Sequence, residues 1–370
     1  MPENKKIPWW EPQISDEDIR GVTEVLKSNF INEGEVTEEF EKKISETLGC
    51  KYTVAVPNCT LGLFAALKAA GVGKGDEVIV PDLTWIATAN AAELAGAIPV
   101  FVDIDPKNLN IDPQSAERAI TERTRAIIPV HVTGRGADME AIMTLSKKYD
   151  LAVIEDAAEA FYSKYKGKYL GTWGQAGAFS LHPFKIITSG QGGFVTTNDK
   201  EIFLRLKMLK NQGKTEKGTG GDDIFKSIGY NLKFTNLQAA IALSQLKQIG
   251  FRADKIRKTR KIYQENLKPG TVNLFPFDIE GGELPLWIDG WTPKRDELHD
   301  YLHAHNITCR KFWHPIHRQK IYKAGSDRDF PESTRMAYQS IWLPSAFTMS
   351  DEDVITVCKH INDFFAKKHE

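Results

Sequence analysis

Short runs rich in valine and isoleucine alternate with helix-forming segments over the first two thirds of the chain. This alternation constrains the fold more than any other feature. EVIVP (77–81), IPVFVDID (98–105) and LAVIED (151–156) are such runs. Strands buried on both faces carry nearly continuous apolar runs, and strands that alternate with helices favour parallel pairing. The pattern therefore predicts an α/β fold with a mainly parallel sheet that helices cover on both faces.

The helical segments carry their own start and stop signals. Ser15 is followed by acidic residues, which is typical of a capped helix start, and TEEFEKKISETLG (37–49) ends in a glycine. A long helical stretch covers residues 236–267, and a shorter mixed pattern with proline and glycine follows it. We therefore predict two domains: a large α/β domain over residues 1–245 and a smaller α+β domain over residues 246–370.

Composition argues against several classes of protein. The 370 residues have a formal net charge of −1, without the basic stripe that nucleic-acid-binding proteins carry. No apolar run is long enough to span a membrane, and the first residues lack a signal-peptide pattern. The four cysteines are scattered and form neither a CxxC pair nor a disulfide framework. We expect a cytoplasmic protein that binds neither nucleic acid nor membrane.

Two motifs resemble sites that the chain does not complete. GVGKGDE (71–77) has the glycines of a dinucleotide-binding turn, but it precedes the strand EVIVP, whereas that motif must follow a strand. The histidines of HAH (303–305) and HPIH (314–317) could suggest a metal. Pro315 interrupts the second pair, and no cysteine or acidic cluster completes a ligand set. We expect a turn at the first motif and no metal site.

Polar and aromatic side chains gather where the predicted strands end, which is where open α/β sheets bind ligands. Taken singly, each has an ordinary interpretation, such as a surface charge, a helix cap or a core aromatic. They are Asn58, Cys59 and Thr60 after TVAV, Trp85 after EVIVP, Asp156 and Glu159 at and after the end of LAVIED, and Ser180 and Lys185 at and after the end of AGAFSL.

Taken together, these side chains fit pyridoxal phosphate. That cofactor needs a lysine amine for its Schiff base and a carboxylate that faces the pyridine nitrogen. A partly desolvated amine has a lowered pKa and becomes nucleophilic, which suits Lys185. The cofactor phosphate favours hydroxyls and the amides of a helix N-terminus, and residues 58–60 open a predicted helix.

The chain resembles the DegT/DnrJ/EryC1/StrS family of sugar aminotransferases over nearly its whole length. The most specific matches are VPDLTWIATANA, VFVDIDP, VIEDAAEA, SLHPFKIITSGQGG and IGYNLKFTNLQAA. The resemblance implies the fold of type I pyridoxal-phosphate enzymes, with a mainly parallel sheet in a large domain and a smaller α+β C-terminal domain. It also implies a homodimer whose active sites are shared between subunits.

The family's functional residues carry over by motif position. Lys185 matches the Schiff-base lysine, Asp156 the acid that pairs with the ring nitrogen, and Trp85 the aromatic that stacks on the cofactor. The other implied cofactor contacts are Glu159 near the ring hydroxyl, Cys59, Thr60 and Ser180 at the phosphate, and Asn231, which reaches the phosphate from the neighbouring subunit. The implied substrate contacts are His182, His314 and His317.

Three residues depart from the family pattern. Cys59 replaces a glycine in the phosphate turn, which raises the question of whether that turn keeps its geometry. Gln191 replaces the glutamate of the usual GEGG, and Lys233 replaces the arginine that usually follows GYN. The last two changes could alter the binding of the substrate or the amino donor.

The resemblance also implies a reaction. An amino group would pass from L-glutamate to a nucleotide-linked 4-keto-6-deoxyhexose, for surface polysaccharide or a glycosylated metabolite. A 3-keto sugar or a cyclitol ketone remains open as the acceptor. The dehydratase branch of the family has a histidine at the position of Lys185, so the lysine argues against that branch. A non-catalytic ligand-binding or regulatory protein on the same fold is the alternative from another class.

Overall fold

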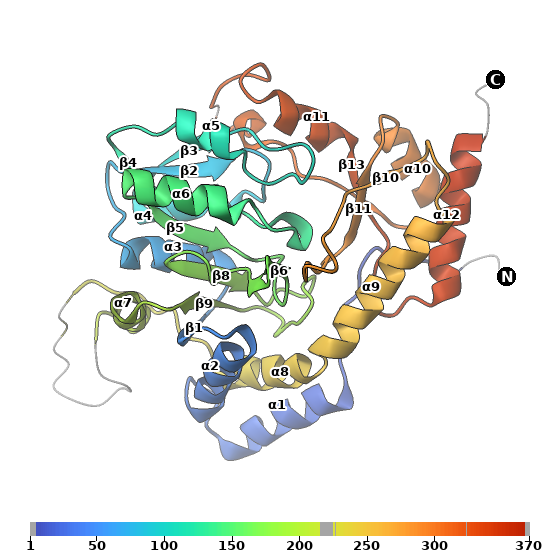
Figure 1. Cartoon of the computed structure of the whole chain (residues 1–370). Coiled ribbons are helices and arrows are strands. Elements are labelled where there is room, and N and C mark those ends of the chain that lie inside the picture. The colour runs from blue at the N-terminus through green and yellow to red at the C-terminus, as the bar shows by residue number, and fades with distance from the viewer. Residues whose placement is uncertain (1–4, 215–224, 226, 323, 367–370) are drawn as a thin grey trace.

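The computed structural model describes residues 5–214, 225, 227–322 and 324–366 (Figure 1). A seven-stranded sheet in the order β1-β9-β8-β5-β4-β2-β3 forms its centre. All neighbouring strands pair in parallel except at β9, which runs antiparallel to both β1 and β8. The predicted mainly parallel sheet is thus confirmed. Its strands are β1 (Tyr52–Val56), β2 (Glu77–Pro81), β3 (Ile98–Val102), β4 (Thr124–Ile127), β5 (Ala152–Asp156), β8 (Ala176–Ser180) and β9 (Gly193–Thr197).

Helices cover both faces of this sheet, as the apolar strands predict. The buried side chains of α2 and α6 pack with Ile79 and Ile127, whereas those of α3, α4 and α7 pack with Val78 and Val80. Neighbouring residues of one strand therefore enter opposite cores. The helices of this part are α1 (Asp16–Ser28), α2 (Glu35–Leu48), α3 (Cys59–Ala69), α4 (Ala87–Ala95), α5 (Pro113–Arg118), α6 (Met139–Tyr149) and α7 (Lys200–Lys210), with a 3-10 turn η1 (Val132–Gly134) and a hairpin of β6 (Lys164–Tyr165) and β7 (Lys168–Tyr169).

The helix signals read from the sequence are confirmed at two ends, and one expected helix is divided. Ser15 caps α1 with a reciprocal capping box, and Gly49 ends α2 in a left-handed conformation with φ of 64°. The long helical stretch forms two helices, α8 (Asn236–Lys247) and α9 (Ile249–Asn266), which meet at Gln248. They turn apart because α8 packs on α1 and α2, while α9 packs on the C-terminal helix α12 (Asp351–Ala366) (Figure 1).

The C-terminal part is a small α+β unit. Its antiparallel sheet has the order β10-β11-β13-β12. The strands are β10 (Asn273–Leu274), β11 (Ile288–Trp291), β12 (Arg310–Lys311) and β13 (Ser340–Leu343), and the helices are α10 (Arg295–Ala304), α11 (Pro331–Gln339) and α12 (Asp351–Ala366), with a 3-10 turn η2 (Ile316–Arg318).

The two parts of the chain share one hydrophobic core. The N-terminal residue Ile7 forms a β-bridge with Ile307, and Trp9 packs on Trp287 and Trp342 of the C-terminal part. A single cluster of buried side chains extends across residue 245. The predicted domain boundary at residue 245 stays a proposal.

Among the helices of the described ranges, none combines the length and the apolar character that crossing a membrane requires. The motif GVGKGDE forms a turn before β2, as its position predicts, with positive φ at Gly71 and Gly75.

Candidate active site

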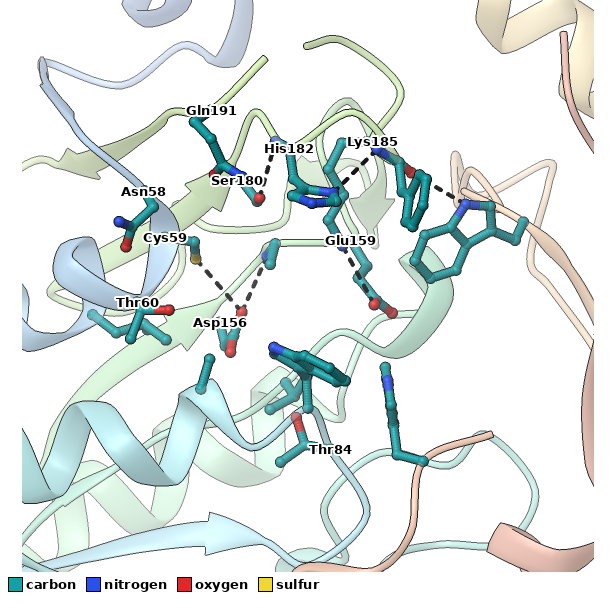
Figure 2. A pocket seen from close by; sticks show the side chains of 18 of the residues that line it. Asn58, Cys59, Thr60, Thr84, Asp156, Glu159, Ser180, His182, Lys185 and Gln191 are labelled. Atoms are coloured by element: carbon teal, nitrogen blue, oxygen red, sulfur yellow. Dashed lines mark hydrogen bonds and ion pairs between the residues drawn. The ribbon is translucent and has the colours of Figure 1, made fainter. Parts of the chain in front are cut away.

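A cavity of about 360 Å³ lies beyond the carboxyl ends of the parallel strands (Figure 2). Open α/β sheets bind ligands at this edge because loops diverge there and leave a crevice. The predicted cofactor contacts that line the cavity are Cys59, Thr60, Trp85, Asp156, Glu159, Ser180 and Lys185, and the predicted substrate contact His182 lines it too. The tertiary structure therefore brings together residues that lie more than a hundred positions apart in the sequence.

Lys185 extends its amine into this cavity from the turn that follows β8 (Figure 2). The Lys185 backbone N–H donates to the carbonyl of His182 at 2.9 Å, which closes the turn. The amine lies 3.5 Å from Oε1 of Glu159 and 4.9 Å from the ring centroid of Trp287. Only 14% of the side chain is exposed, so the amine lies close to one carboxylate and is largely shielded from solvent.

Asp156 is the last residue of β5 and is buried beneath the cavity. Its Oδ2 accepts a hydrogen bond of 2.7 Å from Thr88, and its Oδ1 accepts one of 3.1 Å from the Ala158 N–H. Burial raises the pKa of the Asp156 carboxyl, and the hydrogen bond from Thr88 opposes that rise. A buried carboxylate of this kind favours a cationic partner, and the protonated ring nitrogen of pyridoxal phosphate is such a partner.

Glu159 follows on the same loop and has a partner on each side of its carboxylate. Oε2 accepts from the Thr133 N–H at 2.9 Å, while Oε1 faces the Lys185 amine. Burial raises the pKa of the Glu159 carboxyl, and the positive charge of Lys185 works against that rise. The carboxylate is thus oriented by the backbone and charge-paired with the lysine.

The N-terminus of α3 forms the part of the cavity that suits a phosphate. Asn58 caps this helix through a 3.0 Å hydrogen bond from the Leu61 N–H to Oδ1. Gly193 of β9 lies so close that an added Cβ would be 2.8 Å from the backbone N of Cys59, which explains why a glycine stands there. Thr60 and Ser180 contribute hydroxyls to the same lining. Helix amides and hydroxyls of this kind favour a phosphate dianion.

The structure answers the question that Cys59 raised. The residue starts α3 as part of the regular helix, so no left-handed conformation is required there. Its thiol is buried, 3.9 Å from Oδ1 of Asp156. Burial, reinforced by the neighbouring Asp156 carboxylate, raises the pKa of the Cys59 thiol well above its ordinary value, so the thiol stays neutral.

Three predicted contacts do not line the cavity. Asn231 has an exposed side chain, and its backbone pairs with Asn211. His314 is exposed and packs on Tyr338. His317 is buried with its Nδ1 2.7 Å from Oδ2 of Asp82, where it holds η2 against the end of β2.

Of the residues that depart from the family pattern, Gln191 lines the cavity, whereas Lys233 is not among its lining residues. The absence of a metal site stays a prediction. Within the described ranges, His299, His303 and Cys309 bring potential ligand atoms within 4.8 Å of one another, but none of the three lines the cavity.

Sequence reasoning missed several residues that complete the site. Thr88 anchors Asp156, and Arg310 and Trp287 line the cavity from the C-terminal part. Thr88 belongs to the first turn of α4, and its hydroxyl also lies 3.1 Å from that of Thr84, which precedes the helix. No local signal marked Arg310 and Trp287, because their approach depends on how the C-terminal part packs on the sheet.

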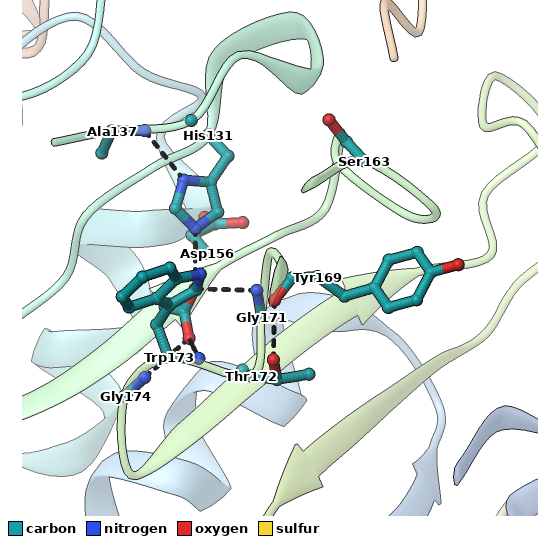
Figure 3. A network of polar contacts seen from close by, with 12 residues as sticks. His131, Ala137, Asp156, Ser163, Tyr169, Gly171, Thr172, Trp173 and Gly174 are labelled. Atoms are coloured by element: carbon teal, nitrogen blue, oxygen red, sulfur yellow. Dashed lines mark hydrogen bonds and ion pairs between the residues drawn. The ribbon is translucent and has the colours of Figure 1, made fainter. Parts of the chain in front are cut away.

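A buried network supports the end of β5 from below (Figure 3). The Ala137 N–H donates to Nδ1 of His131, so the proton of the neutral ring lies on Nε2, which donates to Glu155 at 2.9 Å. Glu155 also accepts three backbone N–H groups, from Gly171, Trp173 and Gly174. Because Glu155 precedes Asp156, this network fixes the strand end from which Asp156 points into the cavity.

The sequence matches the DegT/DnrJ/EryC1/StrS aminotransferase family over residues 12–362. The chain belongs to this family. A relative described as GDP-perosamine synthase, from Escherichia coli O157:H7, is 37% identical over 98% of the chain and 100% of its own length. The chain is therefore a sugar aminotransferase with the fold that the sequence predicted.

Solved structures agree with the family assignment and identify the cofactor. DesV of S. venezuelae has a TM-score of 0.93 at 28% identity, covering 99% of this chain and 100% of that one. Spr1654 of Streptococcus pneumoniae, solved in a PLP form, has a TM-score of 0.92 at 25% identity, covering 97% and 98% of the two chains. The cofactor of this sugar aminotransferase is pyridoxal phosphate, and the buried Asp156, the Lys185 amine and the start of α3 fit it.

Proposed function

We propose that this aminotransferase moves the amino group of L-glutamate to a nucleotide-linked 4-keto-6-deoxyhexose, as a GDP-perosamine synthase would. The observation that carries the proposal is the convergence of the Lys185 amine, the Glu159 carboxylate and the buried Asp156 in one cavity. The GDP-perosamine synthase relative supports the choice of sugar nucleotide.

The bound cofactor supplies an electron sink that stabilises negative charge on the carbon that loses its proton. In our proposal Asp156 keeps the ring nitrogen protonated, because its buried carboxylate is compensated by that charge. Trp85, which is 54% exposed in the present structure, offers its face to cover the cofactor ring. The first residues of α3, together with Ser180, hold the phosphate.

Lys185 holds and moves the proton. Once its amine is free, Lys185 would take the proton from the donor's α-carbon and deliver it to the cofactor within the first half of the reaction. In the second half it would move a proton in the opposite direction, from the cofactor to the sugar carbon that receives the amino group. Glu159, 3.5 Å away, pairs with the protonated amine and keeps it within the cavity. The same arrangement serves both halves, because transfer to the sugar reverses the chemistry of transfer from the donor.

The sugar acceptor is the finer part of the proposal. The turn GQGG (190–193) favours a 4-aminotransferase, because the 3-aminotransferases of this family more often carry a G-x-G-D-A-G pattern there. A 3-keto sugar or a cyclitol ketone is the competing acceptor. Surface polysaccharide or a glycosylated metabolite would receive the product, and the enzyme would work in the cytoplasm.

Product analysis tests this choice directly. The purified enzyme is incubated with L-glutamate and a panel of GDP- and dTDP-linked 4-keto and 3-keto sugars, and the products are identified by mass spectrometry. We expect the amino product from a GDP-4-keto-6-deoxyhexose. Amination of only a 3-keto sugar or of a cyclitol ketone would refute the proposed acceptor.

We further propose a homodimer in which Asn231 of one subunit serves the cofactor phosphate of the other. Its exposed side chain and its place outside the cavity of its own chain support this view. A closed dimer has an isologous interface, so both sites would be completed in the same way.

Mixed dimers test this sharing. Lys185→Ala and Asn231→Asp each disable the homodimer, the second because its charge repels a phosphate. In a mixed dimer one site inherits both changes and the other inherits neither, so co-expression should restore about a quarter of wild-type activity if chains pair at random. Mixed dimers that form without recovering activity would show that Asn231 does not act across the interface.

A further inference from the structure

Arg310 lies at the wall of the active-site cavity and is held there by tryptophans. It belongs to the short strand β12, where it pairs with Trp342 of β13. Its guanidinium carbon lies 5.3 Å from the ring centroid of Trp9, 5.4 Å from that of Trp342 and 5.8 Å from that of Trp85. Aromatic faces of this kind hold a guanidinium in place without using its hydrogen-bond donors.

The other charged side chains of the cavity already have partners. Glu159 pairs with Lys185 and accepts from the backbone, and Asp156 accepts from Thr88 and Ala158. Burial lowers the pKa of His182, and the neighbouring positive charges of Lys185 and Arg310 lower it further, so this ring is neutral at neutral pH.

Within residues 5–214, 225, 227–322 and 324–366, the Arg310 guanidinium forms no ion pair and no hydrogen bond with a side chain or a carbonyl. Burial lowers the pKa of Arg310, and the charge of Glu159 opposes this change. A guanidinium remains charged under these conditions, because its ordinary pKa is far above neutral pH. A half-buried cation with five free donors favours an anionic ligand.

We propose that Arg310 binds a carboxylate of the amino donor, and this inference rests on the proposed function. The planar fork of a guanidinium matches the two oxygens of a carboxylate. A cavity of about 360 Å³ is at the small end of ligand sites, so it suits the cofactor with a small amino acid, whereas a nucleotide must extend beyond it. Arg310 lines this small cavity together with Lys185, where the donor amine must react.

Arg310 then acts in only one half of the reaction, the transfer from the amino donor. The reacting end of a keto-deoxyhexose has no carboxylate, so this sugar would leave the guanidinium without a charged partner. Arg310 should therefore govern donor binding more than binding of the nucleotide. Lys311 provides a matched control, since it is the adjacent cation on β12 but its amine is bound to Asp296 at 2.7 Å, and it does not line the cavity.

The experiment uses the cofactor-loaded enzyme and glutarate, a dicarboxylate without an amine. Binding of glutarate and, separately, of GDP is measured by calorimetry for wild type, Arg310→Gln, Arg310→Lys and Lys311→Gln. We expect Arg310→Gln to weaken glutarate binding by about 10- to 100-fold, because a charge-assisted hydrogen bond is lost. Arg310→Lys should retain part of the affinity. GDP binding should not change, and Lys311→Gln should match wild type.

The melting temperature of each variant and the visible absorbance of its bound cofactor show whether it has folded. If Arg310→Gln does not fold, glutarate binding by Arg310→Lys still tests the role of Arg310. Unchanged glutarate binding, or a loss of GDP binding alone, would overturn the role of Arg310. Separately, L-glutamate should change the cofactor absorbance of wild type. An unchanged absorbance in wild type would refute the proposed donor, whereas an equal change in wild type and Arg310→Gln would refute only the role of Arg310.

Discussion

The Asp289→Ala variant should destabilise the whole protein, because Asp289 is half of a buried ion pair that joins the two parts of the chain. The Arg135 guanidinium donates to both Asp289 oxygens at 2.8 and 2.7 Å, and its Nε donates to the carbonyl of Asn108. The two side chains are 2% and 0% exposed. Without Asp289, the buried Arg135 guanidinium loses the only acidic partner that it has within the described residues.

The expected magnitude follows from this burial. Removing one partner of a buried pair costs about 3–5 kcal/mol, because the remaining charge is left desolvated. The entropy of unfolding is about 2.1 cal/mol/K per residue, so 370 residues give about 0.8 kcal/mol/K. A loss of about 4 kcal/mol then lowers the melting temperature by about 5 °C.

Differential scanning fluorimetry at fixed protein and cofactor concentration measures this shift. The double variant Arg135→Met/Asp289→Leu should recover most of the stability, because apolar side chains of similar volume replace the pair. Glu117→Ala is the control: its pair with Lys148 is 40% and 58% exposed, so its loss should shift melting by about 1 °C or less. An unchanged melting temperature in Asp289→Ala would refute the argument that the pair is desolvated.

Three further variants probe the site. Lys185→Ala should keep its fold and lose about two to four orders of magnitude or more in turnover, measured with the purified enzyme, and near-normal turnover would remove Lys185 from the mechanism. Burial raises the pKa of Asp156, so its ionised form destabilises the cofactor-free protein at neutral pH, and this penalty fades as pH falls through the raised pKa. Cofactor-free Asp156→Asn should therefore melt above wild type at pH 7, with a gap that closes toward pH 4, and should melt below wild type once the cofactor is bound; the same order in both forms would contradict this. Thr88→Val should lower the melting temperature of the cofactor-free protein at pH 7 by about 2–4 °C, because about 1.5–3 kcal/mol of stability is lost with the hydrogen bond to Asp156. The decrease should be smaller in acid, and Thr88→Ser, which keeps the hydroxyl, should match wild type.

Local signals in the sequence predicted most elements of the first part of the chain. The capped start at Ser15, the glycine stop at Gly49 and the apolar run EVIVP depend on interactions within a few residues, and each appears where expected. The division of the long helix at Gln248 was not predicted, because it follows from α8 and α9 packing against different partners.

Some residues of the candidate site could likewise be found from local signals, whereas others depend on packing. Lys185, Asp156 and the start of α3 could be found from sequence because a parallel sheet brings the residues after its strands to one edge. The sequence did not indicate that Thr88 holds Asp156, or that Arg310 and Trp287 close the cavity.

The succession of strands and helices along the chain, and the chemical groups at the strand ends, could therefore be predicted from the amino-acid sequence, since both depend on local periodicity and residue type. The tertiary structure alone decided which partners those groups have. Asp156 lies 68 positions from Thr88, and Arg135 lies 154 positions from Asp289. Contacts over such separations form only when whole elements pack together, because burial is a property of the assembled core and not of any single segment.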